Sequence, residues 1–150
     1  MPISVEIELP PADGPKISRA DLTFYGLDHS GPSYEARVFL GLAEATDGTP
    51  LDDPLYAGSF AVFGHGGCLG DKGHCDVVER RRYDPRPEHP LRKATKVVVA
   101  NEKARGTIAG GGKVRVTVVP IIEPIPYDNV DKKHTEDPVD IGYVKIVTYR

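Results

Sequence analysis

The sequence predicts an all-β protein, a small antiparallel β-sandwich of jelly-roll or cupredoxin-like type with about seven strands. The chain contains 16 Gly and 14 Pro among 150 residues, and both residue types interrupt helices. Short runs rich in Val, Ile, Tyr and Phe lie between these breaks, and several of them alternate apolar with polar residues. The length suits a single domain over residues 1–150, without an evident internal repeat.

The first half of the chain contains three clear strand patterns. Residues 3–9 (ISVEIEL) alternate strictly, which predicts a half-buried strand that ends at the following prolines. Residues 20–25 (ADLTFY) form the second predicted strand. Residues 34–40 (YEARVFL) place two charged side chains on one face and apolar ones on the other. The polar stretch 44–54, rich in Asp, Thr, Gly and Pro, is predicted to be a loop.

Four more strands are predicted in the rest of the chain. Residues 56–63 (YAGSFAVF) are typical of a buried strand, and residues 96–100 (KVVVA) of a short one. Residues 113–120 (KVRVTVVP) alternate again, and residues 141–149 (IGYVKIVTY) complete the set. Residues 101–105 predict no more than one helical turn. Seven such runs separated by turn residues favour two packed antiparallel sheets.

Charge and hydropathy exclude some classes of function. The chain has 19 basic and 22 acidic residues, a net charge of -3, and a pI near 5.9. A nucleic-acid binder needs a surplus of Lys and Arg, so we expect no nucleic-acid partner. No apolar run approaches the roughly 20 residues that span a bilayer, so we expect no membrane helix and a soluble protein. No signal peptide is visible at the N-terminus, which makes a cytoplasmic location the default expectation.

One glycine-rich stretch, residues 63–76 (FGHGGCLGDKGHCD), contains both cysteines and two of the five histidines of the chain. His65, Cys68, His74 and Cys75 form the pattern H-x2-C-x5-H-C, and the glycines allow a tight backbone. Thiolate and imidazole ligands suit Cu(I) or Zn, and four of them complete a tetrahedral site. We therefore predict a metal site at these four residues. Because thiolates are soft, Cu(I) is the favoured ion and zinc is the alternative.

Two other interpretations of this stretch remain open. Cys68 and Cys75 could instead form a local disulfide, if the protein meets an oxidising compartment. Both cysteines could also be plain loop or core residues. If the metal binds elsewhere, the other histidines of the chain are the candidates, namely His29, His89 and His134.

Several segments together resemble a known family. They are residues 34–39 (YEARVF), residues 56–60 (YAGSF) with His65 after them, residues 116–120 (VTVVP) and residues 141–146 (IGYVKI). In the same order, they are similar to strands of the C-terminal β-sandwich domain of type-3 copper proteins, the tyrosinase, polyphenol oxidase and hemocyanin group. The resemblance covers about residues 20–149.

The resemblance implies a function as well as a fold. In that family the C-terminal domain lies over the oxidase active site and restrains it. A type-3 copper centre takes six histidines and this chain has five, so the resemblance implies that the chain is not an oxidase by itself. No catalytic residue is assigned. The expected function is a stand-alone, copper-binding accessory module that handles copper for a partner oxidase, or covers it. The alternatives are a structural or interaction sandwich with a Cys68–Cys75 disulfide, and a mononuclear metal-dependent enzyme.

Overall fold

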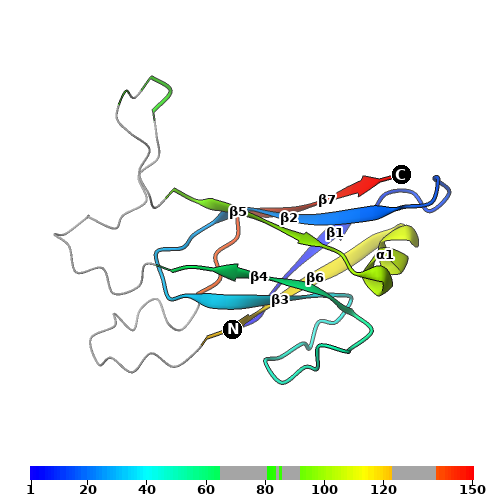
Figure 1. The fold of residues 1–150 in the computed structure, drawn as a ribbon, viewed down its shortest axis with the longest axis horizontal. Coiled ribbons are helices and arrows are strands. Elements are labelled where there is room, and N and C mark those ends of the chain that lie inside the picture. The colour runs from blue at the N-terminus through cyan, green and yellow to red at the C-terminus, as the bar shows by residue number, and fades with distance from the viewer. Residues whose placement is uncertain (65–80, 84, 86–91, 123–137) are drawn as a thin grey trace.

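The computed structural model describes residues 1–64, 81–83, 85, 92–122 and 138–150 (Figure 1). Within these residues, seven strands and one helix follow each other along the chain. They are β1 (Ile3–Glu8), β2 (Arg19–Leu27), β3 (Tyr34–Leu40), β4 (Tyr56–Val62), β5 (Ala94–Val99), α1 (Glu102–Ala109), β6 (Lys113–Ile121) and β7 (Tyr143–Tyr149). Each strand predicted from the alternation pattern is present, with ends that differ by a few residues. The described helix is too short and too polar to cross a membrane.

The strands form two antiparallel sheets, which confirms the predicted sandwich (Figure 1). One sheet has four strands in the order β1-β6-β3-β4, and the other has three in the order β5-β2-β7. The strands β3 and β6 pair in the middle of the larger sheet, where Val38 lies opposite Val118. In the smaller sheet β2 lies in the middle, and Leu22 lies opposite both Val98 and Ile146.

The core fills the space between the two sheets. Along β2, Leu22 and Phe24 are completely buried, and the ring of Phe24 lies 4.9 Å from that of Phe60 on β4. Val116 and Val118 of β6 are also buried, as their alternation predicts. The inward residues of β7 are only partly buried, because β7 is an edge strand.

Gly58 in β4 marks a local irregularity that brings the two sheets together. The pairing of β4 with β3 shifts register beside this residue, where the strand bulges. Gly58 has a φ of 148°, which disfavours a side chain. A Cβ atom here would lie 2.6 Å from Cγ1 of Val98 on β5, so a larger residue would push the sheets apart. The glycine is therefore needed for close packing of β4 against β5.

The helix α1 is longer than the single turn that the sequence predicts. Asn101 caps it, because its side-chain oxygen accepts a hydrogen bond of 2.9 Å from the backbone N–H of Ala104. Ala104 and Ile108 are buried against the sandwich. This burial stabilises two turns of helix in spite of Gly106 in the middle.

Candidate functional site

The predicted metal loop lies outside the residues that the structure describes. His65, Cys68, His74 and Cys75 all fall within residues 65–80. Their arrangement as metal ligands therefore stays a prediction.

The described part of the chain gives little support to a metal site elsewhere. Of the three other histidines, His29 is described, and its Nε2 lies 2.8 Å from the carbonyl oxygen of Arg92. His89 and His134 lie outside the described residues. Among the described residues, no three side chains of His, Cys, Asp or Glu lie close enough together to hold a metal ion. A copper site in this protein would thus need ligands from outside the described residues, where the predicted loop supplies four candidates.

The β2–β3 loop contacts Gly64 and Arg92, the two residues that flank residues 65–91. The backbone N–H of Gly64 donates a hydrogen bond of 3.0 Å to the hydroxyl of Ser33. A Cβ atom on Gly64 would lie only 2.2 Å from the carbonyl oxygen of Gly31, so this approach requires glycine. On the other side, the carbonyl oxygen of Arg92 lies 2.8 Å from Nε2 of His29, which belongs to the same loop. The β2–β3 loop lies at the end of the sandwich opposite α1 (Figure 1).

Asp28 begins this loop, and its environment keeps it ionised. Burial by itself raises the pKa of a carboxyl group. Hydrogen bonds from Ser30 lower this pKa, including one of 2.8 Å from its backbone N–H. The positive charges of Lys93 and His29 lower it further. The balance holds the pKa of Asp28 below its usual value.

Tyr34 lies at the start of β3, and its buried hydroxyl has no hydrogen-bond partner among the residues that the structure describes. Burial, followed by the negative charges of Asp140 and Asp28, raises the pKa of Tyr34 to about 12. The phenol therefore stays protonated at neutral pH and is not a nucleophile there. This end of the sandwich combines acids with a phenol that is neutral at pH 7.

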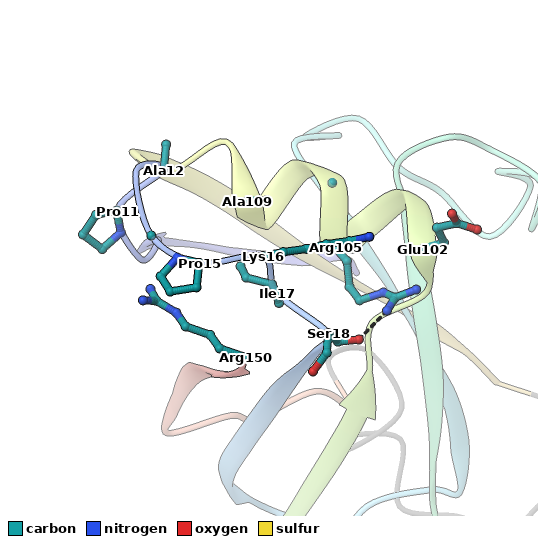
Figure 2. Close-up of a pocket in the computed structure, with 12 residues that line it drawn as sticks. Pro11, Ala12, Pro15, Lys16, Ile17, Ser18, Glu102, Arg105, Ala109 and Arg150 are labelled. Carbon is teal, nitrogen blue, oxygen red and sulfur yellow. Dashed lines mark hydrogen bonds between the residues drawn. The ribbon is translucent and has the colours of Figure 1, made fainter.

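A groove lies at the α1 end of the sandwich (Figure 2). Its volume is about 640 Å³, which lies within the range of small-molecule sites. One wall is the segment between β1 and β2, residues 11–18, which we call the strap. The opposite wall is α1, and Arg150 lies at the edge beside the strap. We call this depression the end groove.

Basic side chains outnumber acidic ones in the end groove. Lys16, Arg105 and Arg150 line it together with a single acid, Glu102. Arg105 donates a hydrogen bond through Nη1 to the carbonyl oxygen of Ser18, which fastens α1 to the strap (Figure 2). Within the described part of the chain, no ion pair joins these three basic residues to an acid. The groove therefore carries a positive local charge on a protein of net negative charge.

The two edge strands of the three-stranded sheet carry exposed apolar residues on their outer face. Val97 and Val99 of β5 and Tyr143, Val147 and Tyr149 of β7 point outward, and each is 41% to 54% exposed. We call these five residues the valine–tyrosine face. In the middle strand β2, Asp21 lies between Val99 and Val147, and Thr23 lies next to Val97. Scattered apolar residues are normal on a protein surface, whereas a set gathered on one sheet favours an interaction site.

Polar groups on the same sheet hold the aromatic rings in place. Tyr25 and Tyr143 stack with ring centres 4.7 Å apart, and the ammonium of Lys145 lies 5.4 Å from the ring centre of Tyr143. The guanidinium of Arg19 lies 5.4 Å from the ring centre of Tyr149. Arg19 in turn binds the carboxylate of Asp21 at 2.7 and 2.9 Å. These contacts order the tyrosines before any partner binds.

The outer face of the four-stranded sheet differs, because the chain itself covers its large apolar residues. Its apolar residues Phe39 and Val119 are buried, and they pack with Ala45 of the β3–β4 loop. Exposed positions on this face include the ion pair of 3.4 Å between Lys113 and Glu6, and Ser59 of β4. One sheet is thus covered by the chain itself, and the other is left bare among the described residues.

Comparison with known proteins supports the fold. No family model and no curated protein matches the chain. Among solved structures, the chain is similar to recombinantly expressed latent aurone synthase (polyphenol oxidase), with a TM-score of 0.55, 20% identity, and coverage of 98% of this chain and 24% of that one. Latent aurone synthase from natural source gives a TM-score of 0.52, 19% identity, and coverage of 99% and 24%.

These comparisons confirm the expected resemblance at the level of fold. The chain spans about a quarter of the length of the polyphenol oxidases that it matches. Nearly all of this chain takes part in the match, which includes the strands on which the resemblance was noted.

Sequence reasoning missed both the end groove and the valine–tyrosine face. The groove joins segments far apart in the chain, so no local pattern indicates it. The face had a signal, because KVVV and YVKIVTY carry apolar residues at both alternating positions. Strands covered on both faces show this pattern.

Proposed function

We propose that this chain is a non-catalytic module that packs onto a copper oxidase domain of the polyphenol-oxidase type and restrains it. The fold matches a quarter of a latent polyphenol oxidase, and the proposal takes the partner to resemble the remainder of such a protein. The five histidines of the chain are too few for a type-3 copper centre, which favours an accessory role.

The observation that carries the proposal is the bare valine–tyrosine face. Interfaces are enriched in Tyr and Arg at their centres, and the sheet presents ordered tyrosines beside Arg19. The chain covers the apolar residues on the outside of its other sheet with its own loop. An exposed apolar sheet therefore favours a partner that covers it.

The restraint is tested with an oxidase domain of this type from the same source, prepared without its own sandwich module. The module is added in increasing amounts while oxidation of an o-diphenol is followed. We expect saturable inhibition, because a bound module limits access of substrate to the copper centre. A rate that stays constant at saturating module would contradict restraint.

The second part of the proposal is that His65, Cys68, His74 and Cys75 bind one copper ion as Cu(I). The support is the chemistry of the donor set, since two thiolates and two imidazoles suit a soft ion. A copper ion held there would be available for transfer to the oxidase. Protons compete with the metal for the thiolates and imidazoles, so binding should weaken as pH falls.

Copper binding is tested by titrating Cu(I) against a chromophoric chelator under reducing conditions. Wild type is compared with a Cys68→Ser/Cys75→Ser variant. We expect wild type to retain one equivalent of copper and the variant to lose it. Equal retention by both proteins would contradict ligation by the cysteines. A thiol titration without reductant distinguishes the disulfide, because a Cys68–Cys75 bond removes both reactive thiols.

A further inference from the structure

We propose that the end groove binds a small organic anion, a carboxylate or phosphate group attached to an apolar body. This site is separate from the valine–tyrosine face and from the predicted metal loop. Lys16, Arg105 and Arg150 supply the positive charge, and they come from three separate parts of the chain. The fold, not a local basic run, brings them to one depression (Figure 2).

Arg105 is held in place before a ligand arrives, and Arg150 lies close to the strap. Arg105 donates one N–H to the carbonyl oxygen of Ser18, and the remaining donors of its guanidinium can bind a ligand. The guanidinium of Arg150 lies against the backbone at Gly14, where a Cβ atom would come within 2.5 Å of Nη2. Planar guanidinium groups bind the two oxygens of a carboxylate or phosphate at once. Lys16 adds a charge without a fixed geometry.

The walls of the groove indicate the rest of the ligand. Pro11, Pro15 and Ile17 of the strap and Ala109 of α1 place apolar surface next to the charged groups. A bare inorganic ion would leave this surface in water, whereas an organic anion covers it. The volume of about 640 Å³ suits a molecule the size of a substituted aromatic ring. Glu102 is the one acid among the lining residues, and it disfavours ligands with a second negative group.

The experiment uses phenyl phosphate as the probe and backbone amide NMR shifts as the readout. Inorganic phosphate and benzyl alcohol, each carrying half of the proposed chemistry, are titrated alongside. We expect phenyl phosphate to shift amides of the strap and α1, and to bind at least several-fold tighter than either control. Benzoate replaces phenyl phosphate in a parallel arm, which shows whether carboxylate or phosphate is preferred. Binding of either one supports the site.

Two substitutions each remove one of the proposed positive charges, and a third substitution is the control. Lys16→Ala and Arg150→Ala should each weaken phenyl phosphate binding about tenfold, the loss of one charge-assisted contact. Lys103→Ala removes the same charge from α1, but its ammonium lies 3.3 Å from the carbonyl of Asp52, outside the groove. It should bind within about twofold of wild type. Well-dispersed amide spectra show that each variant is folded.

Several results would overturn the proposal. Shifts that map to other residues would show that the groove is not the site. Equal binding of benzyl alcohol would show that charge plays no part, and equal binding of inorganic phosphate would show that the apolar wall plays none. The same loss in Lys103→Ala as in Lys16→Ala would reduce the effect to overall charge.

Discussion

Tyr34 shows how one buried hydroxyl links stability to pH. Its hydroxyl has no hydrogen-bond partner in the described part of the chain, and burial raises its pKa from 10.0 to about 12. Above pH 10 the unfolded chain releases this proton while the folded chain keeps it, so the unfolded state binds fewer protons. The contribution of Tyr34 to stability is therefore full below pH 10 and is lost as pH rises toward 12.

Tyr34→Phe is expected to remove this pH dependence. Urea unfolding of wild type should lose about 2 kcal/mol more than the variant between pH 10 and pH 12. At pH 7 the variant should be at least as stable as wild type, because an unpaired hydroxyl no longer has to be buried. Parallel curves across the alkaline range would show that Tyr34 ionises as freely as an exposed tyrosine.

Phe60 tests the packing of the core at a single residue. Its ring contacts Phe24 across the two sheets and is 7% exposed. Phe60→Ala should lower the free energy of unfolding by about 3–5 kcal/mol, through lost burial and a cavity. Ser59→Ala, at the exposed neighbouring position of β4, is the control and should change stability by less than about 0.5 kcal/mol. A loss below about 1 kcal/mol for Phe60→Ala would mean that the assigned register of β4 is wrong.

At the scale of elements, α1 depends on its cap and tolerates a change in its middle. Asn101→Ala removes the acceptor for Ala104 and the donor to the carbonyl of Tyr56, and should destabilise the protein by about 1 kcal/mol. Gly106→Ala should stabilise it by about 0.5–1 kcal/mol, because a Cβ atom there meets nothing within 4 Å. Thermal unfolding measures both. A stabilised Asn101→Ala or a destabilised Gly106→Ala would contradict this description of α1.

The strands were predictable and the helix was only partly so, for a physical reason. Alternation along residues 3–9 and 113–120 reports burial of one face, and the structure pairs these segments as β1 and β6. The helix depends on contacts that the local sequence does not encode. Ala104 and Ile108 gain burial only when the sandwich is already formed.

At the scale of the whole molecule, the sequence predicted the sandwich but not its surfaces. Strand patterns identify which residues face inward, and they do not show whether an outward face is covered. The β3–β4 loop covers Phe39 and Val119, whereas nothing among the described residues covers Val97 and Val147 to the same degree. The end groove depends on the meeting of the strap with α1, a long-range contact. The candidate metal loop rests on its donor chemistry alone.

The proposed function requires the valine–tyrosine face to bind an oxidase domain. Its most direct test is the affinity of the module for that domain, measured by calorimetry for wild type, Val97→Glu and Ser59→Glu. Both variants place one negative charge at a strand position on the surface, on opposite sheets. We expect Val97→Glu to weaken binding at least tenfold, because it buries a charge in an apolar contact, and Ser59→Glu to bind within about twofold of wild type. Equal affinities for all three proteins, or no binding by wild type, would contradict the claim.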